Sequence, residues 1–248
     1  MPYQFALEHE NYGDLAAGKV FYSQANSPFF PVRLTSEIFQ RCQAIRAGYT
    51  DRVTVYDPCC GGGYLLGTLA FLHGAHLRQV IASDIDPDRL ALAERNLSLL
   101  TLEGLNQRIA QIESMQAQFH KESHREALDS AHRLKAQLLK AEESHRIAIT
   151  LFQADALDQA AIAQKIAGLP IDLVITDVPY GRLAHWDRDS SAGLPAIQIL
   201  DSLRPALNPA SVVAICADKS QKIAHPAYQR VDHFQMGKRH IQIFKLSA

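Results

Sequence analysis

Three aspartates stand where a carboxylate could hold a polar ligand. Asp57, Asp84 and Asp177 each end a run of β-branched and other apolar residues, which is typical of a buried strand. Three consecutive glycines at 61–63 follow the first aspartate, and leucines at helical spacing follow the glycines. Glycine has no Cβ, so this loop can approach a ligand closely, and the helix behind it offers unpaired N–H groups. The pattern predicts a strand, a tight loop and a helix beneath a bound small molecule.

The second aspartate suits a ribose. An acidic residue at the end of the second strand of a βαβ unit accepts hydrogen bonds from ribose hydroxyls, and Asp84 stands at that place. A glycine loop alone is shared by many nucleotide- and flavin-binding folds. A dinucleotide dehydrogenase would use the same loop and a ribose acid, but it does not explain the tetrapeptide Asp177-Val178-Pro179-Tyr180.

That tetrapeptide gives the most specific resemblance. With the glycine loop and Asp84, it resembles the S-adenosylmethionine-dependent methyltransferases that act on nitrogen atoms of nucleobases. Longer stretches resemble, more narrowly, the avilamycin-resistance ribosomal RNA methyltransferases of the AviRa type, from about Phe29 to the C-terminus and least over 102–146. The stretches are Pro31–Arg41, Asp57-Pro-Cys-Cys-Gly, Leu77–Asp84, Asp177-Val-Pro-Tyr-Gly-Arg and His185-Trp186.

The resemblance implies a fold and an activity. The fold is an α/β, Rossmann-like class I methyltransferase fold, with a seven-stranded, mainly parallel sheet whose last strand is antiparallel. The expected cofactor is S-adenosyl-L-methionine. The expected substrate is a guanine base nitrogen in large-subunit (23S) ribosomal RNA, free or in a ribosomal particle, and the resemblance implies a link between this methylation and resistance against orthosomycins such as avilamycin.

Other functions stay open at this point. The tetrapeptide is equally suited to N-methylation of another nucleic-acid base, such as DNA adenine, or of a protein amide. From another class, the chain could be a non-catalytic RNA-binding protein with the same fold, although an intact Asp177, Pro179 and Tyr180 argues against this. Val178 stands where many relatives have proline, and it does not distinguish an exocyclic from a ring nitrogen.

The cofactor's parts can be matched to the strand ends. Asp57 can hold the ammonium group, directly or through water, while Asp84 takes the ribose hydroxyls. Asp155 can accept from the adenine amino group, unless it caps the following helix. The residues expected around the cofactor are Asp57, Cys59, Gly61, Gly62, Gly63, Asp84, Ile85, Asp155, Ala156 and Asp177.

The target base is expected at Asp177. Its carboxylate and the carbonyl of Pro179 can accept hydrogens of the base nitrogen, and Tyr180 can stack on the flipped-out base. Residues 177–248 hold nine lysines and arginines against six acidic residues, in a chain of net charge −1, so a local basic face is expected to touch RNA. The expected RNA contacts are Arg182, His185, Trp186, Lys219, Lys222, Lys238 and Arg239.

Length and composition bound the rest. The 248 residues, 47% of them hydrophobic, suit one α/β domain over 1–248, with an N-terminal extension and helix at 1–48 and a helical insertion at 102–146. The four cysteines form no C-x-x-C pair, so no metal or redox centre is expected. Without a signal segment or a long apolar run, the protein is expected to be cytoplasmic. A monomer is favoured.

The expected elements alternate. Strands are predicted near 53–57, 80–84, 149–154, 171–177, 211–217 and 240–246, and helices near 64–73, 87–101, 158–167 and 195–205. Asp86 is expected to cap the helix that starts at Pro87. Thr35 or Ser36 could cap an earlier helix that Gly48 ends. The apolar spacing over 102–146 predicts an α-hairpin, either a structural flap or an RNA-docking arm. The aromatic N-terminal segment is expected to pack on the domain.

Overall fold

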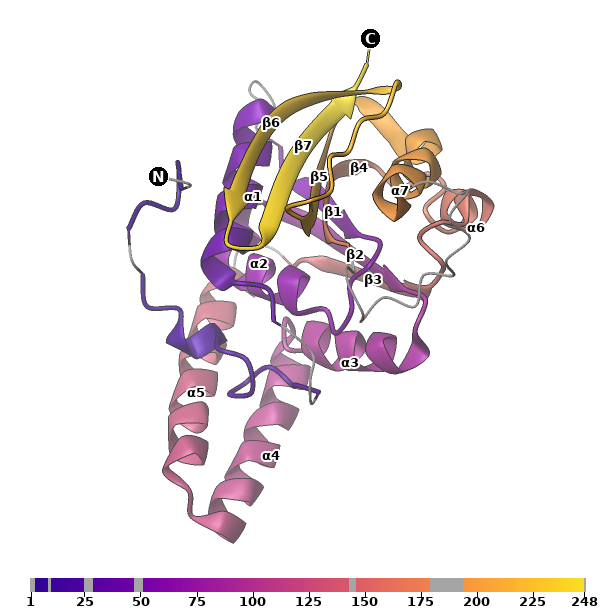
Figure 1. The fold of residues 1–248 in the computed structure, drawn as a ribbon. Coiled ribbons are helices and arrows are strands. Elements are labelled where there is room, and N and C mark those ends of the chain that lie inside the picture. The colour runs from indigo at the N-terminus through magenta and orange to yellow at the C-terminus, as the bar shows by residue number, and fades with distance from the viewer. Residues whose placement is uncertain are drawn as a thin grey trace.

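A single twisted sheet places the three aspartates at one edge. In the computed structural model, which describes residues 3–8, 10–24, 29–46, 51–142 (without the side chains of 141 and 142), 146–178 and 194–247, the strand order is β3-β2-β1-β4-β5-β7-β6. Strands β1 to β5 pair in parallel, whereas β7 is antiparallel to both β5 and β6. The expected mainly parallel sheet with an antiparallel last strand is confirmed (Figure 1). The strands are β1 Val53–Asp57, β2 Leu77–Asp84, β3 Ala148–Gln153, β4 Ile171–Asp177, β5 Leu207–Asp218, β6 Tyr228–Met236 and β7 Arg239–Leu246.

The strand order explains where a ligand can bind. The chain runs outward from β1 through β2 to β3, and then returns to place β4 on the other side of β1. In open α/β sheets, ligands occupy the crevice beyond the carboxyl ends of the strands at such a reversal. Asp57 ends β1, Asp84 ends β2 and Asp177 ends β4, so all three carboxylates belong to this crevice.

Helices cover both faces of the sheet. On one face, α1 (Val32–Ile45), α2 (Tyr64–His73) and α3 (Pro87–Ser98) share an apolar core with alternate residues of the central strands. On the other face, α6 (Gln159–Lys165) and α7 (Pro195–Leu203) enclose a second core. Because both faces are covered, β1 is buried along its whole length, as its run of apolar residues predicts. Short 3₁₀ turns occupy Gly13–Leu15, Gly74–His76 and Arg204–Ala206.

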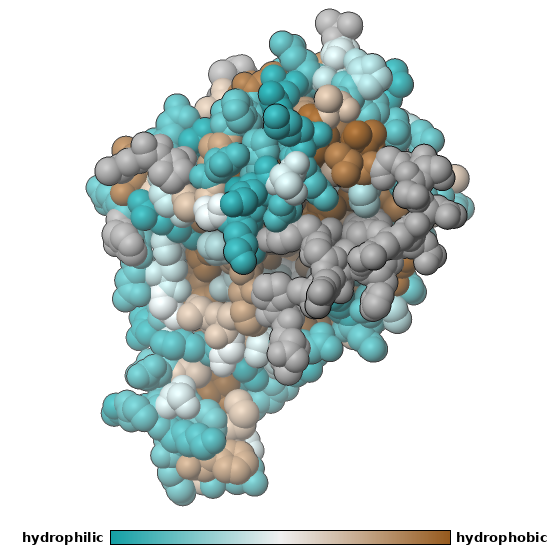
Figure 2. Space-filling model, viewed as in Figure 1, coloured by the Kyte–Doolittle hydropathy of each residue, from teal (hydrophilic) through white to brown (hydrophobic). Residues whose placement is uncertain are grey.

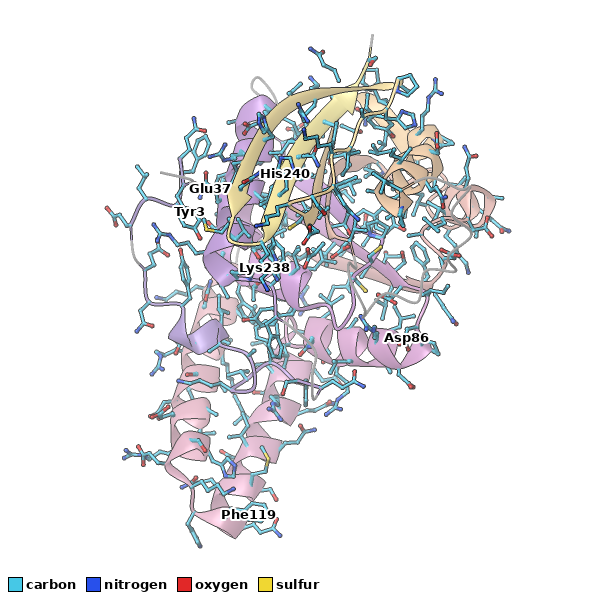
Figure 3. All side chains as sticks on the ribbon, in the orientation of Figure 1. Tyr3, Glu37, Asp86, Phe119, Lys238 and His240 are labelled. Carbon is cyan, nitrogen blue, oxygen red and sulfur yellow. The ribbon has the colours of Figure 1, made fainter. Side chains whose placement is uncertain are left out.

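The insertion forms the expected helical hairpin. Helices α4 (Leu102–Phe119) and α5 (Glu122–Glu142) pack against each other and project away from the sheet (Figure 1). The half of the hairpin near the sheet joins a third apolar core, in which Phe21 and the outward side of α2 also take part. Phe119, labelled in Figure 3 at the far end of the hairpin, is 53% exposed. The N-terminal aromatic segment therefore packs on the domain, as expected, and helps to hold the hairpin.

A buried glutamate fastens the N-terminal segment to α1. Glu37 is fully buried and accepts hydrogen bonds from the backbone N–H groups of Gln4, Phe5 and Ala6, and from Arg41. Figure 3 labels it beside Tyr3. Burial alone would raise the pKa of Glu37, but these donors hold it below its usual value. The charged carboxylate is thus a fixed anchor for this segment.

Several expected boundaries were wrong at the start of α1 and the end of α3. Helix α1 begins at Val32, directly after Pro31, so Thr35 and Ser36 lie inside the helix, buried, and do not cap it. Proline's fixed φ suits the start of a helix, so Pro31 was the better signal. Thr35 and Ser36 suggested a later start, because threonine and serine commonly cap helices. Helix α3 ends at Ser98, because Thr101 accepts a hydrogen bond from Gly104 and caps α4 instead. Gly48, expected to end α1, lies outside the described residues.

Strand β6 was missed entirely. It lies at the edge of the sheet, and only Tyr228 and Phe234 among its residues are buried; the others are partly buried or exposed, and most of them are polar. An edge strand of this kind carries no continuous apolar run, so it resembles a loop in sequence. Strands β2 and β5 also begin earlier than expected, at Leu77 and Leu207.

Within the described ranges, no helix is long and apolar enough to cross a membrane.

Candidate active site at the carboxyl edge of the sheet

The glycine loop adopts a conformation that only glycine takes readily. Gly61 has φ +52 and Gly63 has φ +71, and the N–H of Gly63 donates to the carbonyl of Cys60 at 2.8 Å. A Cβ at Gly63 would lie 3.0 Å from the Cα of Ala93, so this glycine lets α3 approach the loop. A Cβ at Gly61 would meet nothing within 4 Å. The loop therefore faces open space at Gly61, where a ligand would have room.

Asp84 ties the loop to the end of β2. Its Oδ2 accepts from the N–H of Gly61 at 2.8 Å, and its Oδ1 accepts from the N–H of Asp86 at 3.0 Å. Asp86 in turn caps α3, as expected, by accepting from the N–H groups of Asp88 and Arg89. Ile85, between the two aspartates, is 60% exposed and offers an apolar surface next to the carboxylate. A ribose with its attached base would suit this combination of an acid and an exposed apolar side chain.

Asp57 is the most deeply buried of the three acids. It is 2% exposed, and its Oδ1 accepts from the N–H of Cys59 at 3.1 Å. Burial raises the pKa of Asp57 to about 7, and the negative charges of Asp84 and Asp177 act in the same direction. A cationic ligand group beside Asp57 would relieve this cost. The pKa values of the Cys59 and Cys60 thiols are also raised, mainly by burial, so neither is an activated nucleophile.

Asp155 does not cap the next helix. Asp158 does, because its Oδ1 accepts from the N–H of Ala161 at 3.0 Å. Asp155 closes a local turn instead, by accepting from the N–H of Leu157 at 2.9 Å. It lies two residues beyond the end of β3, and Ala156 beside it is buried. Asp155 thus lies past the strand next to β2, on the side where Asp84 would hold a ribose.

Asp177 has a partner that the sequence did not predict. Its Oδ2 lies 3.8 Å from Nε of Arg239, the first residue of β7. Burial raises the pKa of Asp177, while Arg239 and the nearby thiol of Cys216 oppose the shift. Within the described residues, Oδ1 of Asp177 is buried and accepts no hydrogen bond. The carboxylate therefore keeps one oxygen for a ligand.

The expected RNA contacts divide into two groups. Lys219, Lys222 and Lys238 are exposed, and the N–H of Lys219 donates to the carbonyl of Lys238, which joins the end of β5 to the β6–β7 turn. Figure 3 labels Lys238 at this turn, and Figure 2 shows hydrophilic side chains over the hairpin of strands β6 and β7. Arg239, by contrast, has a side chain only 20% exposed and lies at Asp177. The other expected residues of the base and RNA site lie outside the described residues: Pro179, Tyr180, Arg182, His185 and Trp186.

Asn96 is a positioning residue that sequence reasoning missed. It is 1% exposed, and its amide donates to the carbonyls of Gly62 and Tyr22 and accepts from the N–H of Tyr22. It thereby fastens the glycine loop to the N-terminal segment. A signal was present: Asn96 stands between Ala93 and Leu97, both on the buried face of α3. A polar residue on an apolar helix face generally needs such partners.

No group of side chains in the described ranges could hold a metal ion. The polar groups at this edge are carboxylates, which accept hydrogen bonds, and backbone N–H groups and a guanidinium, which donate them; an open space lies above the loop. Such a set suits an organic ligand with an ammonium group, ribose hydroxyls and a flat base. These are the parts of S-adenosyl-L-methionine.

Comparison with known proteins agrees with this geometry. Residues 1–239 match the family described as rRNA methyltransferase AviRa. The 23S rRNA (guanine(2535)-N(1))-methyltransferase of Streptomyces viridochromogenes is 41% identical over 237 residues, which are 96% of this chain and 93% of that protein. Two solved structures of rRNA methyltransferase AviRa from the same organism superpose with TM-scores of 0.88 and 0.86, at 38% and 39% identity, and cover 99% and 98% of this chain and 96% of each relative. The chain therefore belongs to the AviRa family of rRNA methyltransferases.

Proposed function

We propose that this protein transfers the methyl group of S-adenosyl-L-methionine to N1 of a guanine in 23S ribosomal RNA. The relative from S. viridochromogenes carries that activity in its name, and this chain aligns with nearly all of it. The observation that carries the proposal is the position of Asp177. It is a buried carboxylate, at the same sheet edge as Asp57 and Asp84, and one of its oxygens has no hydrogen-bond partner among the residues that the structure describes.

The residues at this edge are suited to the cofactor. Asp57 would pair with its ammonium group, Asp84 would accept from its ribose hydroxyls, and Ile85 would contact its adenine. The open side of Gly61 leaves room for its methionine part. The wider set proposed around it is Cys59, Gly62, Gly63, Asp155, Ala156 and Asp177. When bound, S-adenosyl-L-methionine supplies an electrophilic methyl group on a positively charged sulfur.

Asp177 would prepare the nucleophile. Guanine N1 carries a hydrogen, and its electrons are free to form a bond only as that proton leaves. Oδ1 of Asp177, which accepts no hydrogen bond from the described part of the chain, can accept this proton. Because burial raises its pKa, Asp177 is a stronger base than an ordinary surface carboxylate. Pro179 would accept a further hydrogen of the base through its carbonyl, and Tyr180 would stack on the flipped base.

The RNA backbone would be held by exposed basic residues next to this edge. Lys219, Lys222 and Lys238 lie around the end of β5 and the β6–β7 turn. Arg182, His185 and Trp186, which follow the tetrapeptide in sequence, are proposed to complete the RNA surface. Because the whole chain has a net charge of −1, the phosphate contribution to affinity should be modest.

Transfer of a labelled methyl group tests this proposal directly. The protein is incubated with tritium-labelled S-adenosyl-L-methionine and, separately, with ribosomal RNA, ribosomal particles, DNA and a protein extract. Label should enter 23S RNA, free or in particles. Label in DNA or in protein would show a different N-methyltransferase. RNA binding without any transfer would show a non-catalytic RNA-binding protein.

We further propose that the methyl group protects the ribosome against orthosomycins such as avilamycin. A susceptible strain that expresses the protein should then tolerate more of the antibiotic than the same strain with an Asp177→Asn variant. Equal susceptibility of the two strains would remove this role while leaving the methylation itself in place.

Two glycine variants should distinguish the glycine that leaves space for the cofactor from the glycine that the packing of the fold requires. Gly61→Ala and Gly63→Ala both force a left-handed conformation on alanine, at a cost of roughly 1–2 kcal/mol each. Gly63→Ala should lose more stability, because its Cβ would also press on the backbone of Ala93. Gly61→Ala should lose more affinity for S-adenosyl-L-methionine. Chemical denaturation and calorimetry measure the two effects, and unchanged affinity in Gly61→Ala would remove the cofactor from that space.

Cofactor affinity should rise with pH up to about neutrality. The pKa of Asp57 is about 7 in the free protein, and only the ionised carboxylate pairs with an ammonium group. Below pH 7 each unit should therefore cost about tenfold in affinity. Because folding raises the pKa of Asp57, the stability that this residue contributes to the free protein is present at low pH and is lost as the pH rises through about 7. Calorimetry between pH 5.5 and 7 tests the first effect, and Asp57→Asn should bind weakly with little pH dependence.

A further inference from the structure

We infer that Arg239 contacts the target base itself and donates a hydrogen bond to the carbonyl oxygen O6 of guanine. This inference rests on the proposed function and names the residue that selects the base. The sequence placed Arg239 among the expected RNA contacts, together with Lys238 and Lys219. The structure gives it a different environment.

Two unsatisfied buried groups lie side by side at the end of β4. Within the described residues, Nε of Arg239 is buried and has no hydrogen-bond partner, and neither has Oδ1 of Asp177. The two side chains are close, because Nε lies 3.8 Å from the other carboxylate oxygen, Oδ2. An unpaired buried donor and an unpaired buried acceptor are each costly. Their presence together indicates a ligand that supplies one acceptor and one donor.

Guanine carries such a pair on one edge. Its N1–H is a donor, and the adjacent C6 carbonyl is an acceptor. Asp177 would take the N1 hydrogen, and Arg239 would donate to O6. Adenine presents the opposite pattern, an acceptor at N1 beside an amino group at C6, and cytosine does likewise at N3 and C4. Each would set donor against donor and acceptor against acceptor, so the Asp177–Arg239 pair selects a keto base.

The fold fixes Arg239 in this position. Because β7 is antiparallel to β5, its first residue pairs with Asp218 at the carboxyl end of β5. Arg239 lies on the same face of β7 as Ile241 and Ile243, two and four residues further on, which lie in the core beneath α1. Its guanidinium carbon also lies 5.3 Å from the centre of the buried Phe30 ring, which holds the cation from a second side. A rigidly held hydrogen-bond donor of this kind can stabilise negative charge that forms on the base during the reaction.

Charge develops at O6 during the reaction. As the N1 proton passes to Asp177, negative charge spreads from N1 to O6. A positive donor already in place at O6 lowers the cost of that charge, as donors do in an oxyanion hole. Arg239 would therefore act on the rate of methyl transfer more than on RNA affinity. A phosphate contact would act in the opposite way, on affinity and its salt dependence.

The test compares Arg239→Gln and Arg239→Lys with Lys238→Gln, a matched exposed neighbour. Each full-length variant is saturated with S-adenosyl-L-methionine and 23S RNA, and single-turnover rates are measured against pH. Arg239→Gln should lose about 10²–10³-fold in rate, and its pH profile should move to higher pH. Its salt slope of RNA binding and its cofactor affinity should stay as in the unchanged protein. Arg239→Lys, which keeps the charge next to Asp177, should retain part of the rate.

Lys238→Gln should behave as the loss of a phosphate contact does: RNA binding should weaken, and its salt slope should fall by about one. If Arg239→Gln behaves in this way, the inference is wrong and Arg239 is a phosphate contact. Should the glutamine variant unfold, Arg239→Lys carries the test: a single-turnover rate equal to that of the unchanged protein would overturn the inference. Product analysis keeps the two claims apart. Methylation of uracil N3, also beside a carbonyl, would overturn the guanine proposal alone, whereas methylation of adenine would overturn both.

Discussion

Asp177→Asn should lose most of the rate of methyl transfer while the protein keeps its fold and nearly all of its affinity for S-adenosyl-L-methionine. The asparagine has nearly the same shape but cannot take the N1 proton, so the rate should fall by about 10²–10⁴-fold, as expected for loss of a general base. Cofactor affinity should persist, because the ammonium and ribose contacts are assigned to Asp57 and Asp84. Single-turnover rates and calorimetry measure the two quantities.

The same variant should be at least as stable as the unchanged protein. Burial raises the pKa of Asp177, which means that its charged form is disfavoured in the folded state. That penalty is present above the folded pKa and disappears when the group is neutral, so asparagine removes it at neutral pH. Thermal unfolding at pH 7 checks the sign. A variant that is inactive because it has unfolded would not support a catalytic role.

Asp172 offers a matched control on the same strand. It stands near the amino end of β4, where its carboxylate pairs with Arg46 at 2.9 Å and Arg78 at 2.8 Å and accepts from the N–H of Thr54. Asp172→Asn should weaken these ion pairs and lower stability, without changing the rate of the folded protein. Full activity in Asp177→Asn, or an equal loss of rate in both variants, would contradict the assignment of Asp177.

Asp84→Asn should weaken S-adenosyl-L-methionine binding by roughly 1.5–3 kcal/mol, the range for hydrogen bonds to a charged group, which is about 10–150-fold in Kd. The carboxylate is proposed to hold the ribose, and it also accepts from the N–H of Gly61. An amide has a single acceptor oxygen, so it cannot accept from both Gly61 and Asp86 as the carboxylate does, and the glycine loop should loosen as well. Calorimetry with the folded variant measures the loss.

Asp86→Asn is the control for this variant. Asp86 lies two residues further on and caps α3, and asparagine caps helices as well as aspartate does. Its cofactor affinity should therefore stay unchanged. Unchanged affinity in Asp84→Asn would remove that residue from the site. Tighter binding of NADH than of S-adenosyl-L-methionine by the unchanged protein would contradict the cofactor itself.

The parallel part of the fold and its carboxyl edge could be predicted from sequence. Asp57, Asp84 and Asp177 each end an apolar run, and parallel strands bring their ends to one edge whatever the details of packing. The helical hairpin could also be predicted, because apolar residues repeat at helical spacing in each of its two helices.

The partner of Asp177 could not be predicted in the same way. Arg239 reaches it only because β7 runs antiparallel and pairs along β5. The chain enters β7 from β6, an edge strand whose mostly polar sequence resembles a loop. The clamp formed by Asn96 depends on the path of the N-terminal segment, which has no periodicity of its own. Long-range contacts of these two kinds are set by tertiary structure and leave little local signal.

Nucleoside analysis of the product tests the central claim most directly. 23S RNA from a host without this modification is incubated with the protein and S-adenosyl-L-methionine, digested, and examined by mass spectrometry, with reverse transcription to locate the site. The expected product is a single guanine methylated at N1, which blocks its Watson–Crick edge and stops the transcriptase, and which is absent with Asp177→Asn. A methyl group on a ribose 2′-oxygen would contradict the account, because that hydroxyl does not pair its proton with an adjacent carbonyl for Asp177 and Arg239 to recognise.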